Sequence, residues 1–120
     1  MNTSWDDNTP IYRQIKAQIA REILEGALSE GAMLPSVRQV AATSQVNPIT
    51  VSRAFQELAD EGIVEKRRGL GMVVLEGARD RLLELEQSRF LTQEWPNILA
   101  RINLLKIQPA TLFPLNGAIS

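Results

Sequence analysis

Two helix-start signals, eleven residues apart, constrain the fold of this chain more than any other feature. Ser36 is followed three residues later by Gln39, which is the pattern of a capping box. Asn47 is followed by Pro48, which joins a favoured N-cap residue to a proline at the first helical position. Two short helices this close together, with a tight turn between them, predict a helix-turn-helix.

A basic, glycine-rich hairpin follows the second of these helices. The strand-like run Ile63–Arg67 leads into the turn Arg68–Gly71, and Met72–Leu75 returns as a second strand. A hairpin in this position acts as the wing of a winged helix-turn-helix. We therefore expect residues 1–76 to form one winged helix-turn-helix domain.

Apolar periodicity predicts the rest of this domain. Thr9 and Pro10 begin a first helix that ends near Gly26, with isoleucines at every fourth position facing the core. Residues 32–34 are expected to form a short strand, and residues 43–45 are expected to interrupt the preceding helix, with a valine packed beneath the turn. The inward-facing residues expected on the two helices of the helix-turn-helix are Val37, Val40, Ala41, Val51, Ala54, Phe55 and Leu58.

Residues 77–120 are expected to form a separate dimerisation region of two helices with an irregular tail from residue 108. The pattern predicts one helix over Ala78–Leu91 and a restart of the chain at Trp95-Pro96. So short a region is too small for an independent effector-binding domain, and its amphipathic helices suit pairing with a second copy. The fold class is mainly α with a small β-hairpin (α+β). The expected interface residues are Leu82, Leu85, Phe90, Trp95, Ile98, Leu99, Ile102 and Leu105.

Composition excludes several classes of protein. The 120 residues are 44% hydrophobic and 22% charged, which is a normal globular balance. The absence of cysteine and histidine removes disulfides, thiolate metal sites and the usual general base. No phosphate loop or dinucleotide motif is present, so we expect no catalysis, metal or cofactor. The polar N-terminus and short apolar runs predict a cytoplasmic protein without membrane association.

The charge balance does not by itself favour nucleic acid as a partner, because the net charge is −1. Charge is nevertheless sorted along the sequence. Lys66–Arg68 are contiguous cations, whereas Glu57, Asp60 and Glu61 gather at the far end of their helix. Two readings of the fold therefore stay open: a DNA-binding regulator, or a protein-interaction module without a DNA role.

Outward side chains of the helix-turn-helix and hairpin are candidates for DNA contact. Arg38 lies in the first turn of its helix, where a cation opposes the helix dipole, so a phosphate or guanine would satisfy it. Arg53 can bind guanine, and Asn47 can read adenine as well as cap its helix. The expected DNA-binding residues are Ser36, Arg38, Asn47, Pro48, Ile49, Thr50, Ser52, Arg53, Lys66, Arg67, Arg68, Gly69 and Gly71.

Four blocks of this sequence resemble the GntR family of bacterial transcriptional regulators. They begin at Pro10, Leu34, Val46 and Gly62, and they read PIYRQIK, LPSVRQVA, VNPITVSRAFQEL and GIVEKRRGLG. The resemblance covers about residues 9–75. The short helical remainder is similar in length and helicity to the YtrA-like subfamily, whose reduced C-terminal region serves dimerisation.

The resemblance implies a repressor, commonly of transporter operons, that binds an inverted-repeat operator in double-stranded DNA as a homodimer. It places DNA contacts on Arg38, on residues 47–53 and on the glycines of the wing. The chain departs from the family pattern at Leu70, where a polar or basic residue is common, and at Met72, where the family usually continues with Thr-Phe-Val. An unidentified small-molecule effector is a further partner left open.

Overall fold

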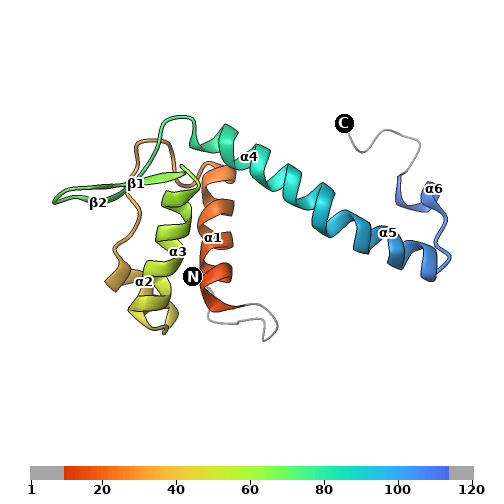
Figure 1. Ribbon diagram of the computed structural model, residues 1–120, viewed down its shortest axis with the longest axis horizontal. Helices are drawn as coiled ribbons and strands as arrows, with labels where there is room; N and C mark the ends of the chain where they lie inside the picture. The colour runs from red at the N-terminus through yellow and green to blue at the C-terminus, as the bar shows by residue number, and fades with distance from the viewer. Residues whose placement is uncertain (1–9, 114–120) are drawn as a thin grey trace. The chain divides into compact units, whose positions relative to one another are not determined.

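The computed structural model describes residues 10–113, which divide into two compact units, one ending at Glu84 and the other beginning at Leu85. The first unit contains three helices and a two-stranded antiparallel hairpin, together with the first turns of a fourth helix (Figure 1). These elements are α1 (Ile11–Glu25), α2 (Val37–Ser44), α3 (Pro48–Asp60), β1 (Val64–Arg67), β2 (Gly71–Val74) and α4 (Ala78–Arg89). The predicted winged helix-turn-helix is confirmed.

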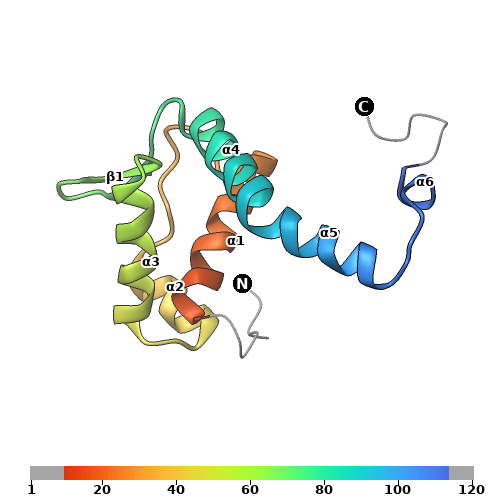
Figure 2. The ribbon, with the colours of Figure 1, turned by 45° about the vertical axis from the view of Figure 1, so that its right-hand side comes forward.

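Helix α1 packs along α3 and supplies much of the core (Figure 2). Ile15, Ile19 and Ile23 recur on one face of the helix, and each is buried. Ile11 belongs to the same sequence series but is 39% exposed, because it begins the helix beyond the edge of the core. The helix ends at Gly26, whose φ of 87° lies in the left-handed region that favours glycine. The N-cap expected at residue 9 lies outside the described residues.

The two helix-start signals form as predicted. Ser36 Oγ accepts a hydrogen bond from the N–H of Gln39 at 3.0 Å, and Gln39 Oε1 accepts one from the N–H of Ser36 at 2.9 Å. Asn47 Oδ1 accepts a hydrogen bond at 2.9 Å from the N–H of Ile49. These local hydrogen bonds satisfy backbone donors that a helix start would otherwise leave unpaired.

The end of α2 differs from the prediction. Ser44 does not interrupt the helix: it is the last residue of α2 and is fully buried. A serine can be buried when its hydroxyl is hydrogen-bonded, and every buried side-chain polar atom of the described residues has a partner. Gln45 makes the turn with a left-handed φ of 57°. The predicted core positions are buried at Val40, Ala41, Val51, Ala54, Phe55 and Leu58, while Val37 and Val46 are half-buried.

The hairpin is joined by a third extended segment. β1 and β2 pair in antiparallel register, with Lys66 opposite Met72. The segment expected as a strand lies along the other edge of β2, where the Val74 N–H donates to the Ala32 carbonyl and the Leu34 N–H donates to the Met72 carbonyl, both at 2.9 Å. This pairing ties the base of the wing to the chain that enters α2.

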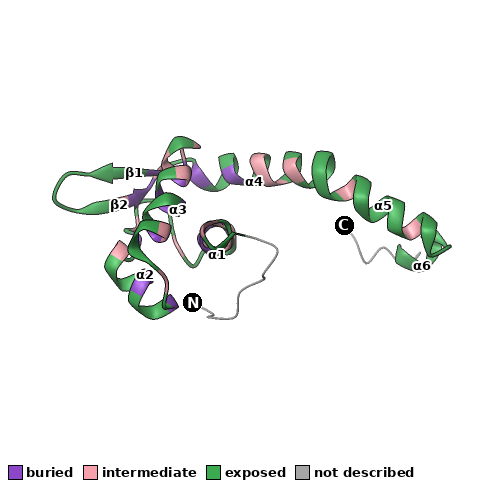
Figure 3. Cartoon of the chain, turned by 60° about the horizontal axis from the view of Figure 1, so that its bottom comes forward, coloured by how far each residue is buried: buried purple, intermediate pink, exposed green. Residues whose placement is uncertain are grey.

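The second unit consists of the end of α4, a π-helical stretch η1 (Phe90–Glu94), α5 (Trp95–Leu104) and a single turn α6 (Pro109–Leu112). Helix α5 begins at Trp95, as expected, but no break separates it from α4, because η1 keeps the chain helical: the Trp95 N–H bonds to the Phe90 carbonyl five residues earlier. Proline has no N–H to donate, and the wider π turn accommodates this loss. No side chain in η1, α5 or α6 is buried (Figure 3).

Candidate nucleic-acid interface

The first turns of α3 present the residues expected to read DNA. Ile49, Ser52 and Arg53 are exposed, and Thr50 is half-buried. They project from a helix whose opposite face is anchored in the core. Asn47 is exposed beside them, and only its Oδ1 is used for capping. The amide nitrogen of Asn47 therefore remains available as a donor.

Arg38 stands on the surface in the first turn of α2. No acidic residue occupies that turn, and no carboxylate of residues 10–113 forms an ion pair with this guanidinium. A cation held at the positive end of a helix raises the local potential, which suits an anion. Arg38 and the start of α2 therefore form a positive corner of the domain.

A hollow of about 510 Å³ lies between α2, α3 and the hairpin. It brings together residues from three separate parts of the sequence, including the predicted Ser36, Ser52, Lys66 and Gly71. Sequence reasoning missed Gln56, although its position four residues after Ser52 places both on one face of α3. The remaining lining residues are Met33, Leu34, Pro35, Val37, Gln39, Phe55, Leu70 and Met72.

The basic run Lys66–Arg68 is not a single patch. Side chains alternate along a strand, so Lys66 and Arg67 lie on opposite faces of β1. Lys66 lines the hollow, whereas Arg67 Nε lies 3.6 Å from Glu65 Oε2. Arg68 and Gly69 follow in the exposed turn, and Gly69 has a φ of 77° that favours glycine.

Arg53 makes a contact that the sequence did not reveal. Its Cζ lies 3.8 Å from the centroid of the Tyr12 ring, and its Nη2 donates to Tyr12 Oη at 3.2 Å. On its other side, Arg53 Nε is 3.8 Å from Glu57 Oε2. The guanidinium is thus drawn towards α1, because cation–π attraction and hydrogen bonding act together.

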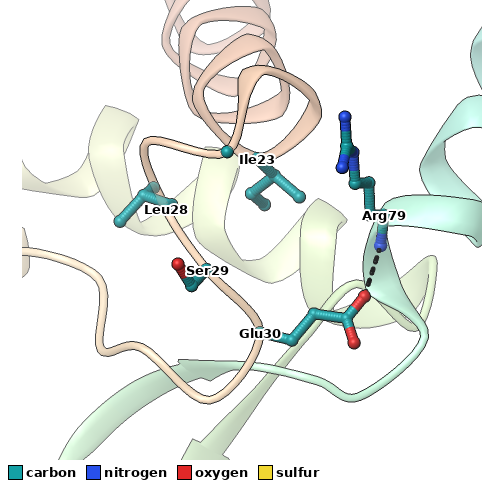
Figure 4. A pocket seen from close by; sticks show the side chains of 6 residues that line it. Ile23, Leu28, Ser29, Glu30 and Arg79 are labelled. Atoms are coloured by element: carbon teal, nitrogen blue, oxygen red, sulfur yellow. Dashed lines mark hydrogen bonds between the residues drawn. The ribbon is translucent and has the colours of Figure 1, made fainter.

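Glu30 is a second residue that sequence reasoning did not single out. Its carboxylate accepts a hydrogen bond from the N–H of Gly77 at 2.9 Å. It accepts a second from the N–H of Arg79 at 3.3 Å, which is drawn in Figure 4. Both bonds stabilise the ionised carboxylate, the bond from Gly77 more than the bond from Arg79. They hold the pKa of Glu30 below its ordinary value of 4.5. The adjacent pocket of about 320 Å³ includes Ile23 and Leu28. Glu30 therefore fixes the start of α4, a structural role.

The expected dimerisation residues fall into two groups. Leu82 is 1% exposed in the core of the first unit, so its assignment to an interface was wrong: its side chain is already packed within one chain. The others lie in the second unit, where Phe90 and Trp95 have ring centroids 6.4 Å apart. Among these seven residues of the second unit, Phe90, Ile98, Leu99 and Leu105 are exposed, and Leu85, Trp95 and Ile102 are half-buried.

Two further properties bear on the kind of site. Within residues 10–113, each helix is either too short or too polar to traverse a lipid bilayer. The chain has no histidine or cysteine, and the acidic side chains of residues 10–113 form no group of three or more that could hold a metal ion.

Three packed helices, a two-stranded wing and a hollow between α2, α3 and that wing define a winged helix-turn-helix protein. The profile described as "Bacterial regulatory proteins, gntR family" matches residues 11–74, and the chain belongs to that family. The repressor YtrA of Bacillus subtilis (strain 168) is 46% identical over 77 residues, which are 64% of this chain and 59% of that protein. The chain spans about three fifths of the length of the first curated relatives it matches.

Solved structures show the same relationship. A GntR family transcriptional regulator from Listeria monocytogenes has a TM-score of 0.74 and 30% identity, covering 97% of this chain and 100% of that one. BusR of S. agalactiae, solved in complex with its busAB promoter DNA, has a TM-score of 0.58 and 27% identity. That match covers 93% of this chain and 59% of BusR.

Proposed function

We propose that this protein is a sequence-specific DNA-binding transcriptional regulator, acting as a repressor at an inverted-repeat operator. The observation that carries the proposal is the convergence of α2, α3 and the wing on one concave face lined by Ser36, Ser52 and Lys66. The relatives are named as transcriptional regulators, which supports a regulatory and not an enzymatic role. Because its target would be chromosomal DNA, the protein would act in the bacterial cytoplasm.

In this proposal α3 enters the major groove, which admits one α-helix. Asn47, Thr50 and Ser52 meet base edges, since their amide and hydroxyl groups both donate and accept hydrogen bonds. Ile49 is 76% exposed, and such an apolar side chain suits contact with a thymine methyl group. The start of α3 would thus recognise bases both through hydrogen bonds and through an apolar contact.

Phosphate contacts would fix the domain on the duplex. Lys66 offers a cation on the wing, and Arg38 offers one beside the N-terminus of α2, where a phosphate or a guanine would satisfy it. Arg68, Gly69 and Gly71 would follow the flanking backbone. Such contacts set orientation but carry no direct sequence information.

The second unit would pair two copies of the chain. No side chain of η1 or α5 is buried within one chain. The large apolar side chains of Phe90, Ile98, Leu99 and Leu105 are therefore exposed and could be covered by a second copy. A two-fold interface buries the same surface of both partners, and it matches the two-fold symmetry of an inverted repeat. Leu85, Trp95 and Ile102 would complete this surface.

The proposal is tested by selecting preferred duplexes from random DNA and then measuring binding at two salt concentrations. We expect an enriched inverted repeat, bound with an affinity that falls steeply with salt because each neutralised phosphate releases counterions. A reporter gene placed behind the enriched site should be silenced by the protein. Failure to enrich any sequence, with weak binding to all duplexes, would reject sequence-specific recognition and favour the protein-interaction role.

A further inference from the structure

Tyr12, in the first turn of α1, is shared by two arginines. Arg53 of α3 stacks on its ring and donates to its hydroxyl oxygen at 3.2 Å. Arg13 Nε donates to the same oxygen, also at 3.2 Å, and Arg13 Cζ lies 5.8 Å from the ring centroid. Two guanidinium groups from two different helices therefore converge on one phenol oxygen.

Neighbouring carboxylates only partly balance this positive charge. Glu57 lies 3.8 Å from Arg53 Nε, but it also lies 3.3 Å from Lys16 Nζ. Glu61 lies 2.7 Å from the same Lys16 nitrogen. No described carboxylate forms an ion pair with Arg13. The excess positive charge is thus concentrated at the Arg13–Arg53 end of the α1–α3 contact, one turn nearer the start of α3 than Glu57.

We propose that Tyr12, Arg13 and Arg53 together bind one phosphate of the DNA backbone. Guanidinium groups present planar sets of N–H donors that match phosphate oxygens, and a phosphate between them would relieve the repulsion of the two cations. Tyr12 Oη accepts a hydrogen bond from each arginine and keeps its own hydrogen as a donor. No acceptor for that hydrogen is found among residues 10–113.

This site gives Arg53 a different task from base reading. Its guanidinium is directed towards Tyr12 on α1, so it holds the backbone that borders the major groove. Discrimination among bases then falls to Asn47, Thr50 and Ser52 of the second helix of the helix-turn-helix, together with Arg38 of the first. The inference rests on the proposed function, because the phosphate belongs to the duplex that α3 reads.

The test compares variants on two duplexes, the sequence selected by the wild type and a scrambled version. Tyr12→Phe removes only the hydroxyl, while Arg13→Gln and Arg53→Gln each remove one guanidinium. We expect each change to weaken binding to both duplexes by the same factor, roughly three- to tenfold. Arg13→Gln should also reduce the slope of log affinity against log salt by about one.

Arg21→Gln provides the matched control, because Arg21 is also an exposed arginine of α1 and lies about 12 Å further along the helix axis. It should change neither the affinity nor the salt slope beyond experimental error. Equal effects of Arg13→Gln and Arg21→Gln would overturn the proposal, as would a changed base preference in Arg53→Gln. If the wild type itself selects no duplex, the proposed function fails before any variant is compared.

Discussion

Glu30 accepts a hydrogen bond at 2.9 Å from the backbone N–H of Gly77, which lies 47 residues further along the chain. A second bond from the N–H of Arg79 completes the contact. An acidic side chain that receives N–H groups at a helix start satisfies unpaired donors and interacts favourably with the helix dipole. The turn that follows α1 thereby secures the beginning of α4.

Glu30→Ala should lower the midpoint of thermal unfolding by more at about pH 7 than at about pH 3. The hydrogen bonds depress the folded-state pKa of Glu30 below 4.5, so its stabilising contribution is present above the unfolded-state value. That contribution is lost as the pH falls through the lower, folded-state pKa. Circular dichroism melts at the two pH values measure it, with Glu25→Ala as an exposed acidic control. A deficit that persists undiminished at low pH would contradict the role of the charge.

Arg38→Ala should weaken binding to the selected duplex by about 1–3 kcal/mol and relax the preference at one base position. The guanidinium stands at the positive end of α2 without an ion-pair partner among the described residues, so an anionic or guanine partner would stabilise it. Competition binding against single-base variants of the duplex measures both effects. Unchanged affinity would remove Arg38 from the site, and an equal loss on every duplex would limit it to phosphate contact.

Lys66→Ala should reduce DNA affinity more than Arg67→Ala, although the residues are adjacent and each substitution removes one positive charge. Lys66 lines the hollow between α2, α3 and the hairpin, whereas Arg67 lies on the other face of β1 beside Glu65. We expect Lys66→Ala to reduce the salt slope by about one and Arg67→Ala to leave it nearly unchanged. Titrations at several salt concentrations distinguish them, and equal slopes would show that the whole wing is used as a diffuse basic patch.

Leu99→Glu should convert a dimer into a monomer. Leu99 lies on the exposed apolar face of α5, and a carboxylate buried without a partner in a two-fold interface is strongly unfavourable. Sedimentation velocity should show the change, and the affinity for the inverted repeat should fall towards that for a half-site. Ala100→Glu introduces the same charge on the opposite side of α5 and should leave the dimer intact. Dissociation by both variants, or by neither, would argue against this face.

The sequence predicted those parts of the fold that are fixed by local interactions. Ser36, Asn47 and Gly26 mark helix ends through their own side chains or backbone conformation, so their effects can be read from neighbouring residues. Ser44 and Leu82 are buried by packing between segments that are distant in the sequence, so the apolar pattern of either helix alone does not predict their burial. The π turn before Pro96 likewise reflects a helix that continues where a break was the simpler expectation.

The sequence predicted those interface residues whose place in the helix-turn-helix motif defines their role. It did not predict contacts between side chains from distant parts of the sequence. Arg53 was expected from its place on α3, but its partner Tyr12 lies 41 residues away in the sequence. The separation of Lys66 from Arg67 could have been predicted, because the two-residue period of a strand places neighbours on opposite faces. Glu30 carries no sequence signal that distinguishes it from other exposed acids.

The burial of Ala78 and Leu82 determines how small an independently folding winged helix-turn-helix fragment can be. A fragment that ends at Glu76 would lose both side chains and open the core to water. Removing a buried leucine side chain alone commonly costs about 2–5 kcal/mol, a large share of the stability of a domain of this size. Limited proteolysis should therefore leave a resistant core that retains the first turns of α4. A core that ends at Gly77, before α4 begins, should not accumulate.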